Sequence, residues 1–105
     1  MYCVIYRFQI IESQEDRLIK SWTKVTQAFI DHCGALGSRL RKNEKLEYIA
    51  YAQRPSKEKR DNADLPVEIK KGACAEMSSS CKDIQVLFEL TPVSDLLIKS
   101  SYNDV

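Results

Sequence analysis

Two hydrophobic periods follow one another in the first third of this chain, and their order limits the folds that it can adopt. Over residues 2–11, apolar and aromatic side chains recur at every second position, which is typical of a β-strand. The spacing then changes to three or four residues, which predicts an amphipathic helix that ends at Gly34. Ser13, followed by acidic residues, should cap the start of this helix. The apolar stripe of the helix comprises Leu18, Trp22, Val25, Phe29 and Cys33, widened by Ile19 and Ile30.

The rest of the chain continues in the order strand, strand, helix, strand. Alternating side chains predict strands over residues 36–42 and 46–53, with a hairpin turn at Asn43 and Glu44. A second amphipathic helix is expected next, and its apolar face comprises Val67, Cys74, Met77 and Cys81. The alternation returns over residues 83–91, which predicts the last strand.

This order of elements is that of a ferredoxin-like α+β domain, βαββαβ. Right-handed crossovers give a four-stranded antiparallel sheet with both helices on one face, so the other face is left open. Large exposed apolar patches are uncommon on monomers, and the first strand is apolar on both sides. We therefore expect a homodimer that packs two open sheet faces together. The domain should span residues 1–93, with a C-terminal tail over residues 94–105.

Charge and cysteine usage narrow the expected partners and location. The chain has 16 basic and 15 acidic residues, and this balance creates no field that would attract nucleic acid or a membrane. We find neither a signal peptide nor a run of about 20 apolar residues, so we expect a cytoplasmic protein. The four cysteines lack the closely spaced pairs of zinc sites, so we expect reduced thiols and no metal site.

Two segments of the chain carry a family resemblance. Residues 4–22 (VIYRFQIIESQEDRLIKSW) and 34–58 (GALGSRLRKNEKLEYIAYAQRPSKE) resemble the antibiotic biosynthesis monooxygenase (ABM) domain family. The resemblance implies a dimeric α/β barrel of two ferredoxin-like units, with a pocket between the sheet and the helices of each subunit. It also implies a cofactor-independent monooxygenase that oxidises a small aromatic or quinol substrate.

Haem-degrading members form another branch of this family, and their functional residues match this chain poorly. The asparagine of their first strand corresponds to Tyr6, and the tryptophan after their third strand corresponds to Arg54. Their haem-ligand histidine should fall within residues 62–66, which contain no histidine. Because haem-iron chemistry needs an axial ligand, we consider haem degradation the less favoured activity.

Cofactor-free oxygenation requires a protein to bind an electron-rich ring, to remove a proton from it and to stabilise the resulting anion. The catalytic candidates are Tyr6, His32 and Arg54, and His32 is the one side chain with an ordinary pKa near neutrality. The candidates for substrate binding are Tyr6, Trp22, Arg39, Tyr48 and Tyr51.

Each candidate also has a structural interpretation. Trp22 has the spacing of a core residue, and His32 can stabilise the C-terminal end of its helix. Arg54 opens a basic run that is typical of solvated surface. The alternative to an enzyme is thus a non-catalytic dimeric module that binds a small ligand or a protein partner.

Overall fold

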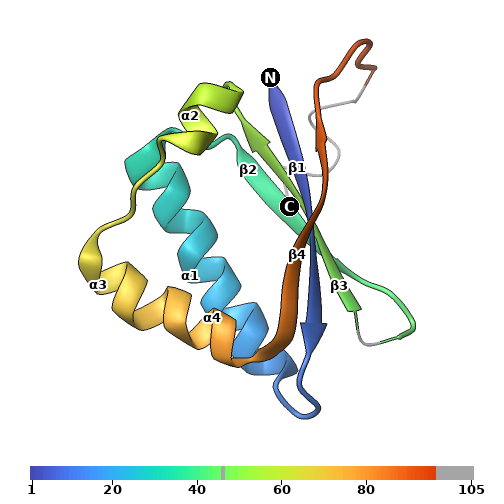
Figure 1. Ribbon diagram of the computed structural model, residues 1–105, viewed down its shortest axis with the longest axis vertical. Coiled ribbons are helices and arrows are strands. Elements are labelled where there is room, and N and C mark those ends of the chain that lie inside the picture. The colour runs from blue at the N-terminus through green and yellow to red at the C-terminus, as the bar shows by residue number, and fades with distance from the viewer. Residues whose placement is uncertain (46, 97–105) are drawn as a thin grey trace.

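The computed structural model describes residues 1–45 and 47–96 and confirms the ferredoxin-like α+β fold (Figure 1). Strands β1 (Tyr2–Ile10), β2 (Gly37–Lys42), β3 (Glu47–Arg54) and β4 (Cys81–Leu90) form one antiparallel sheet in the order β2-β3-β1-β4. Helix α1 (Glu15–Cys33) follows β1. Helices α2 (Lys57–Asp61), α3 (Val67–Ile69) and α4 (Ala75–Ser79), with the π-helical segment η1 (Lys70–Cys74), connect β3 to β4. The predicted tail includes residues 97–105, which lie outside the described residues.

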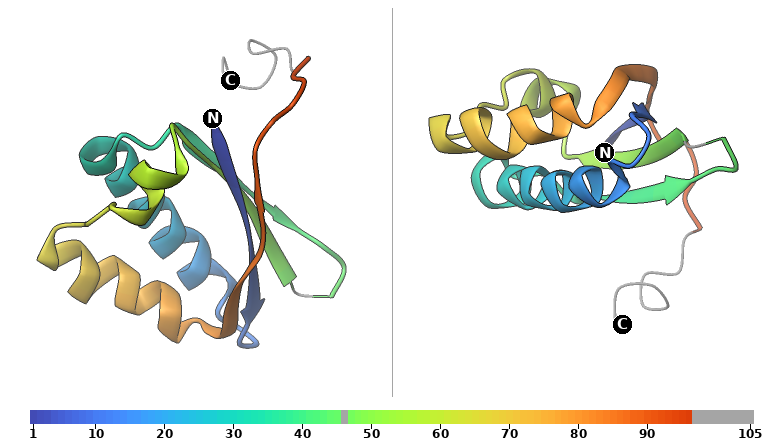
Figure 2. Two further views of the ribbon diagram at one scale, coloured as in Figure 1. Left: turned by 45° about the horizontal axis from the view of Figure 1, so that its top comes forward. Right: turned by 90° about the horizontal axis from the view of Figure 1, so that it is seen from below.

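The helices form one layer and the sheet forms the other, as the two views of Figure 2 show. Successive side chains of a strand point to opposite faces, so every second side chain of β1 and of β3 faces the helices. On β1 this set includes Val4 and Phe8, which are buried. On β3 the side chains that face the helices include Tyr48, Ala50 and Ala52, which pair with even-numbered residues of β1. The apolar period of two seen in the sequence therefore builds the core.

Helix α1 confirms the predicted apolar stripe but not its predicted cap. Leu18 is buried against the sheet, and Val25 is buried against the segment that connects β3 to β4. The helix ends at Gly34, whose φ of 69° is left-handed. Ser13 instead lies in a turn with a φ of 74°, and the amide of Gln14 donates to the carbonyl of Ile11 at 3.0 Å. This turn moves Ser13 out of capping geometry, so the helix begins after Gln14 without a side-chain cap. The predicted widening of the stripe is also wrong, since Ile19 and Ile30 are exposed.

The connection between β3 and β4 differs most from the prediction. The expected single helix is interrupted by the wider turns of η1, which shift the face that packs against α1. Val67 is consequently exposed, while Ile69 and Met77 pack against the buried cluster that contains Val25. Cys81 pairs with Ile10 as the first residue of β4 and is not part of a helix.

The second face of the sheet has no helix over it within residues 1–45 and 47–96 (Figures 1 and 2). Phe88 and Leu90 are exposed there. In the strand register, Ile5 pairs with Phe88 on one side and with Tyr51 on the other. This open face is the surface on which the sequence predicts a dimer contact. In the part of the chain that the structure describes, no helix has the length and apolar character needed to cross a bilayer.

Candidate functional site

A cavity of about 260 Å³ lies between the sheet and the layer formed by α1 and the η1–α4 segment. Its lining is mostly apolar and includes the aromatic side chains of Phe8, Trp22 and Phe29. The inward positions of β3 hold Ala50 and Ala52, whose short side chains leave space that larger residues would fill. The cavity is therefore a consequence of small residues on β3 that lie opposite aromatic residues of β1 and α1.

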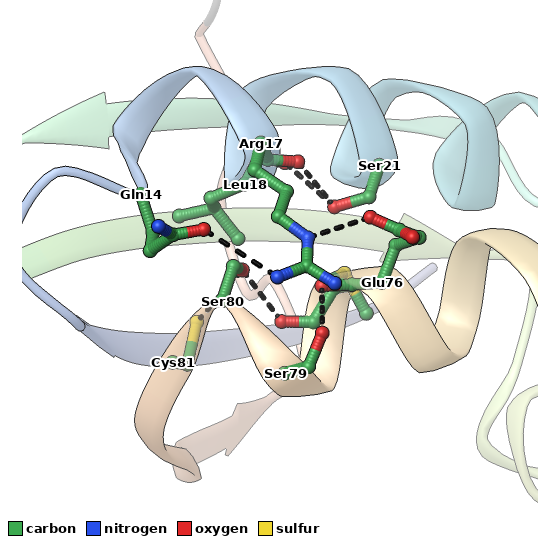
Figure 3. A network of polar contacts seen from close by, with 9 residues as sticks. Gln14, Arg17, Leu18, Ser21, Glu76, Ser79, Ser80 and Cys81 are labelled. Carbon is green, nitrogen blue, oxygen red and sulfur yellow. Dashed lines mark hydrogen bonds and ion pairs between the residues drawn. The ribbon is translucent and has the colours of Figure 1, made fainter.

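One edge of the cavity wall is held by contacts between the ends of α1 and α4 (Figure 3). The guanidinium of Arg17 on α1 donates to the carboxylate of Glu76 on α4 at 2.6 Å, and to Gln14 at 3.4 Å. The hydroxyl of Ser80 donates to the carbonyl of Met77 at 2.7 Å and so ends α4. These contacts hold Met77, which lines the cavity, close to α1.

Arg54 provides the cavity with a buried positive charge. It is the last residue of β3 and pairs with Tyr2, on the sheet face that packs against the helices. Its side chain is only 7% exposed, and its guanidinium carbon lies 4.2 Å from the centre of the Phe29 ring. Neither its Nε nor its Nη1 has a hydrogen-bond partner among the described residues. Burial lowers the pKa of Arg54, but a guanidinium remains charged in proteins, so the cavity holds a cation with unused donors.

Tyr6 and Arg60 extend this positive end of the cavity. Tyr6 lines the cavity, and its hydroxyl raises the pKa of the neighbouring Arg60 guanidinium. Arg60 itself is paired with the carboxylates of Glu89 at 3.2 Å and Asp61 at 3.4 Å. Its charge is thus compensated, whereas no ion pair to Arg54 occurs in residues 1–45 and 47–96.

Ser38 is a second polar group without a partner in the cavity wall. It lies on β2 opposite Ala52, so it shares the helix-facing side of the sheet with Arg54. Its hydroxyl oxygen is buried and has no hydrogen-bond partner among the described residues. Buried polar groups are normally paired, so two such groups in one apolar cavity mark a place for a polar part of a ligand.

The structure brings three of the predicted site residues together and separates the others from them. Tyr6, Trp22 and Arg54 all line the cavity, and the surface interpretation of Arg54 is wrong because its side chain is buried. Trp22 also packs against the core, so the two interpretations of this residue are compatible.

The remaining candidates lie outside the cavity. Tyr51 and Arg39 pair with each other on the open sheet face, where the Tyr51 hydroxyl donates to the sulfur of Cys3 at 2.9 Å. Tyr48 faces the helices but donates its hydroxyl to the Glu15 carboxylate at 2.8 Å, and burial raises its pKa to about 12. His32 is exposed in the last turn of α1, which is the position expected for a residue that stabilises the helix end.

The cavity residues do not fit an iron ligand set. The lining contains no histidine, and its one thiol, Cys74, has a pKa raised by burial, which disfavours the thiolate that binds iron. No group of three or more metal-binding side chains gathers anywhere in the described part of the chain. All four cysteines carry free thiols.

The fold and the cavity together define a ferredoxin-like domain with an apolar pocket between sheet and helices that has one cationic end. The sequence matches no family model and no curated protein. Several solved structures share the fold. One is an antibiotic biosynthesis monooxygenase, with a TM-score of 0.69, 15% identity, and coverage of 90% of this chain and 100% of that chain.

Two further structures are described as candidate antibiotic biosynthesis monooxygenases. The protein from Caulobacter crescentus has a TM-score of 0.71 and 13% identity, covering 89% of this chain and 90% of that chain. The protein from Deinococcus radiodurans has a TM-score of 0.70 and 11% identity, covering 93% of this chain and 98% of that chain. The chain therefore has the ABM fold, and at these identities the similarity concerns the fold alone.

Proposed function

We propose that this chain is a cofactor-independent monooxygenase that oxidises a small aromatic or quinol substrate in the cavity. The observation that carries the proposal is the combination of aromatic walls with the buried guanidinium of Arg54, whose Nε and Nη1 have no hydrogen-bond partner among the described residues. A ring that enters between Trp22 and Phe8 would place an acidic hydroxyl or methylene group near this charge. A nearby positive charge lowers the pKa of such a group, so the substrate would bind as its electron-rich anion.

The proposed chemistry follows from this anion. A carbanion or phenolate passes electrons to molecular oxygen, which supplies both the oxidising power and the inserted atom. One oxygen atom enters the substrate, and the other leaves as water with two hydrogens taken from the substrate. Tyr6 and Arg54 would donate hydrogen bonds to the anionic oxygen, and the apolar lining would keep bulk water away.

A non-catalytic binding module is the second candidate. It is favoured by the composition of the lining, which has no histidine and no carboxylate to act as a general base among its described residues. Under the monooxygenase proposal, stabilisation of the anion by Arg54 replaces a base, and the proton passes to solvent. Both candidate functions therefore require an aromatic ligand in the cavity, and only the monooxygenase converts that ligand to a product.

Oxygen consumption separates these candidates. We expect the protein to stimulate oxygen uptake with members of a panel of quinols and anthrone-like compounds. Tyr6→Phe should lower the rate about tenfold or more, because a hydrogen bond to a charged group is worth about 1.5–3 kcal/mol. Tyr2→Phe is the matched control, since Tyr2 lies on the same strand but donates to Glu89 outside the cavity. No stimulated uptake across the panel would leave the binding module as the function.

We also propose that the chain acts as a homodimer through the open sheet face, in the cytoplasm. The exposure of Phe88 (59%) and Leu90 (43%) on this face supports the dimer, because burying both removes apolar surface from water. The free state of all four cysteines is compatible with a reducing compartment.

A further inference from the structure

Arg54 and Ser38, the two residues of the cavity wall with unpaired polar atoms among the described residues, indicate which polar group the ligand carries. A buried donor without a partner costs about 1–3 kcal/mol, and more when it is charged. Within residues 1–45 and 47–96, the Nε and Nη1 hydrogens of Arg54 and the hydroxyl of Ser38 have no hydrogen-bond partner. The cation–π contact with Phe29 offsets part of this cost but uses none of the N–H donors.

The charge of the missing partner follows from the surroundings of Arg54. The carboxylates of this region, Glu89 and Asp61, pair with Arg60 and leave Arg54 without a counter-ion among the described residues. A neutral acceptor would satisfy one donor but would leave a buried positive charge uncompensated. An anion satisfies both requirements.

The shape of the site selects among anions. A guanidinium is a planar fork of donors that matches the two oxygens of a carboxylate, and the Ser38 hydroxyl lies on the same sheet face as a further donor. A phosphate dianion would bring a second negative charge into a lining that is otherwise almost wholly apolar. One cation and one hydroxyl therefore suit a singly charged carboxylate.

The rest of the ligand is defined by the size of the cavity. An apolar cavity of about 150 Å³ holds benzene, so one of about 260 Å³ has room for two fused rings or one substituted ring. Trp22, Phe8 and Phe29 provide apolar surfaces for such rings.

We propose that the cavity is specific for a small aromatic carboxylate, whose carboxylate group binds Arg54 and Ser38 while its rings lie among the aromatic side chains. This inference rests on the proposed function in placing the ligand in the cavity. It goes further by assigning Nε and Nη1 of Arg54 to a carboxylate that the substrate carries in addition to its ionisable hydroxyl or methylene group.

Calorimetric titration with a matched pair of probes tests this proposal. The probes are 2-naphthoate and its neutral amide, 2-naphthamide, which have the same rings. Wild-type protein should bind the acid at least about tenfold more tightly than the amide, the size expected for a hydrogen-bonded charge pair. Equal affinities for the two probes would overturn the proposal without the need for any variant.

Three variants locate the preference. Arg54→Gln should weaken binding of 2-naphthoate about tenfold or more and leave 2-naphthamide nearly unchanged. Arg54→Lys keeps the charge but not the planar fork, so it should retain part of the preference. Arg41→Gln, on an exposed residue of the open sheet face, should change neither affinity. An unchanged preference in Arg54→Gln would contradict the assignment of this residue, and circular dichroism checks that each variant is folded.

The two proposals fail in different ways. A tenfold preference for the acid without oxygen uptake on any aromatic substrate would overturn the monooxygenase and support the carboxylate site. Oxygen uptake on quinols together with equal binding of acid and amide would overturn the carboxylate site and support the monooxygenase.

Discussion

Arg54 is an unusual residue for a stable core, because a buried guanidinium normally has a carboxylate or several acceptors around it. Here its clearest contact is the face of the Phe29 ring. Residues that weaken a fold in this way are typical of functional sites, where stability is given up for binding. The position of Arg54 in the cavity wall thus agrees with its proposed role.

A stability measurement on Arg54→Met tests this interpretation. Methionine has a similar length and no charge, so we expect the free energy of unfolding to stay the same or to rise by about 1–2 kcal/mol. Urea denaturation followed by circular dichroism gives this value, with Arg41→Met as a control on the exposed sheet face. A loss of more than about 2 kcal/mol would mean that the arginine has a structural role.

The side of the sheet on which each candidate lies could have been predicted from the sequence. Residues 48, 50, 52 and 54 share one face by the strand period, which places Arg54 inside and Tyr51 outside. The basic residues that follow Arg54 favour a solvated surface, and this charge pattern conflicts with the inward position that the strand period gives to Arg54. The orphaned hydroxyl of Ser38 could not be predicted, because it depends on which side chains surround it in three dimensions.

At the scale of elements, β3 creates the cavity and the helices close it. The inward alanines Ala50 and Ala52 were visible in the sequence as small residues at core positions, and this was the missed signal for a cavity. The long α1 followed from its period, but the interruption at η1 did not. A π-helical turn depends on packing against α1 and has no clear signature in the sequence.

Filling the cavity from β3 should abolish function without unfolding the protein. Ala52→Leu adds three carbons where the structure has empty space, so we expect a change in stability of less than about 1.5 kcal/mol. Both binding of 2-naphthoate and oxygen uptake should be lost. Ala75→Leu, on the exposed side of α4, is the control and should affect neither. Undiminished binding in Ala52→Leu would place the ligand site elsewhere.

At the scale of the whole molecule, one sheet face is covered by helices and the other is open. The proposed dimer would cover the open face, and light scattering should then give about twice the 12.1 kDa mass of one chain at micromolar concentration. Phe88→Glu should restore the monomer mass, because it places a charge in the apolar contact. Val67→Glu is the matched control, since Val67 is similarly exposed (54%) but lies on the helical layer. A wild-type mass near that of one chain would rule out the dimer.

In the proposed reaction, one atom of molecular oxygen enters an aromatic substrate bound in the cavity. Isotope labelling tests this reaction most directly, with mass spectrometry of the product formed under heavy oxygen gas in ordinary water. We predict a product that carries one heavy oxygen atom, formed by the wild-type protein and lost in Ala52→Leu. A product whose new oxygen comes from water, or no product with any substrate of the panel, would contradict the claim.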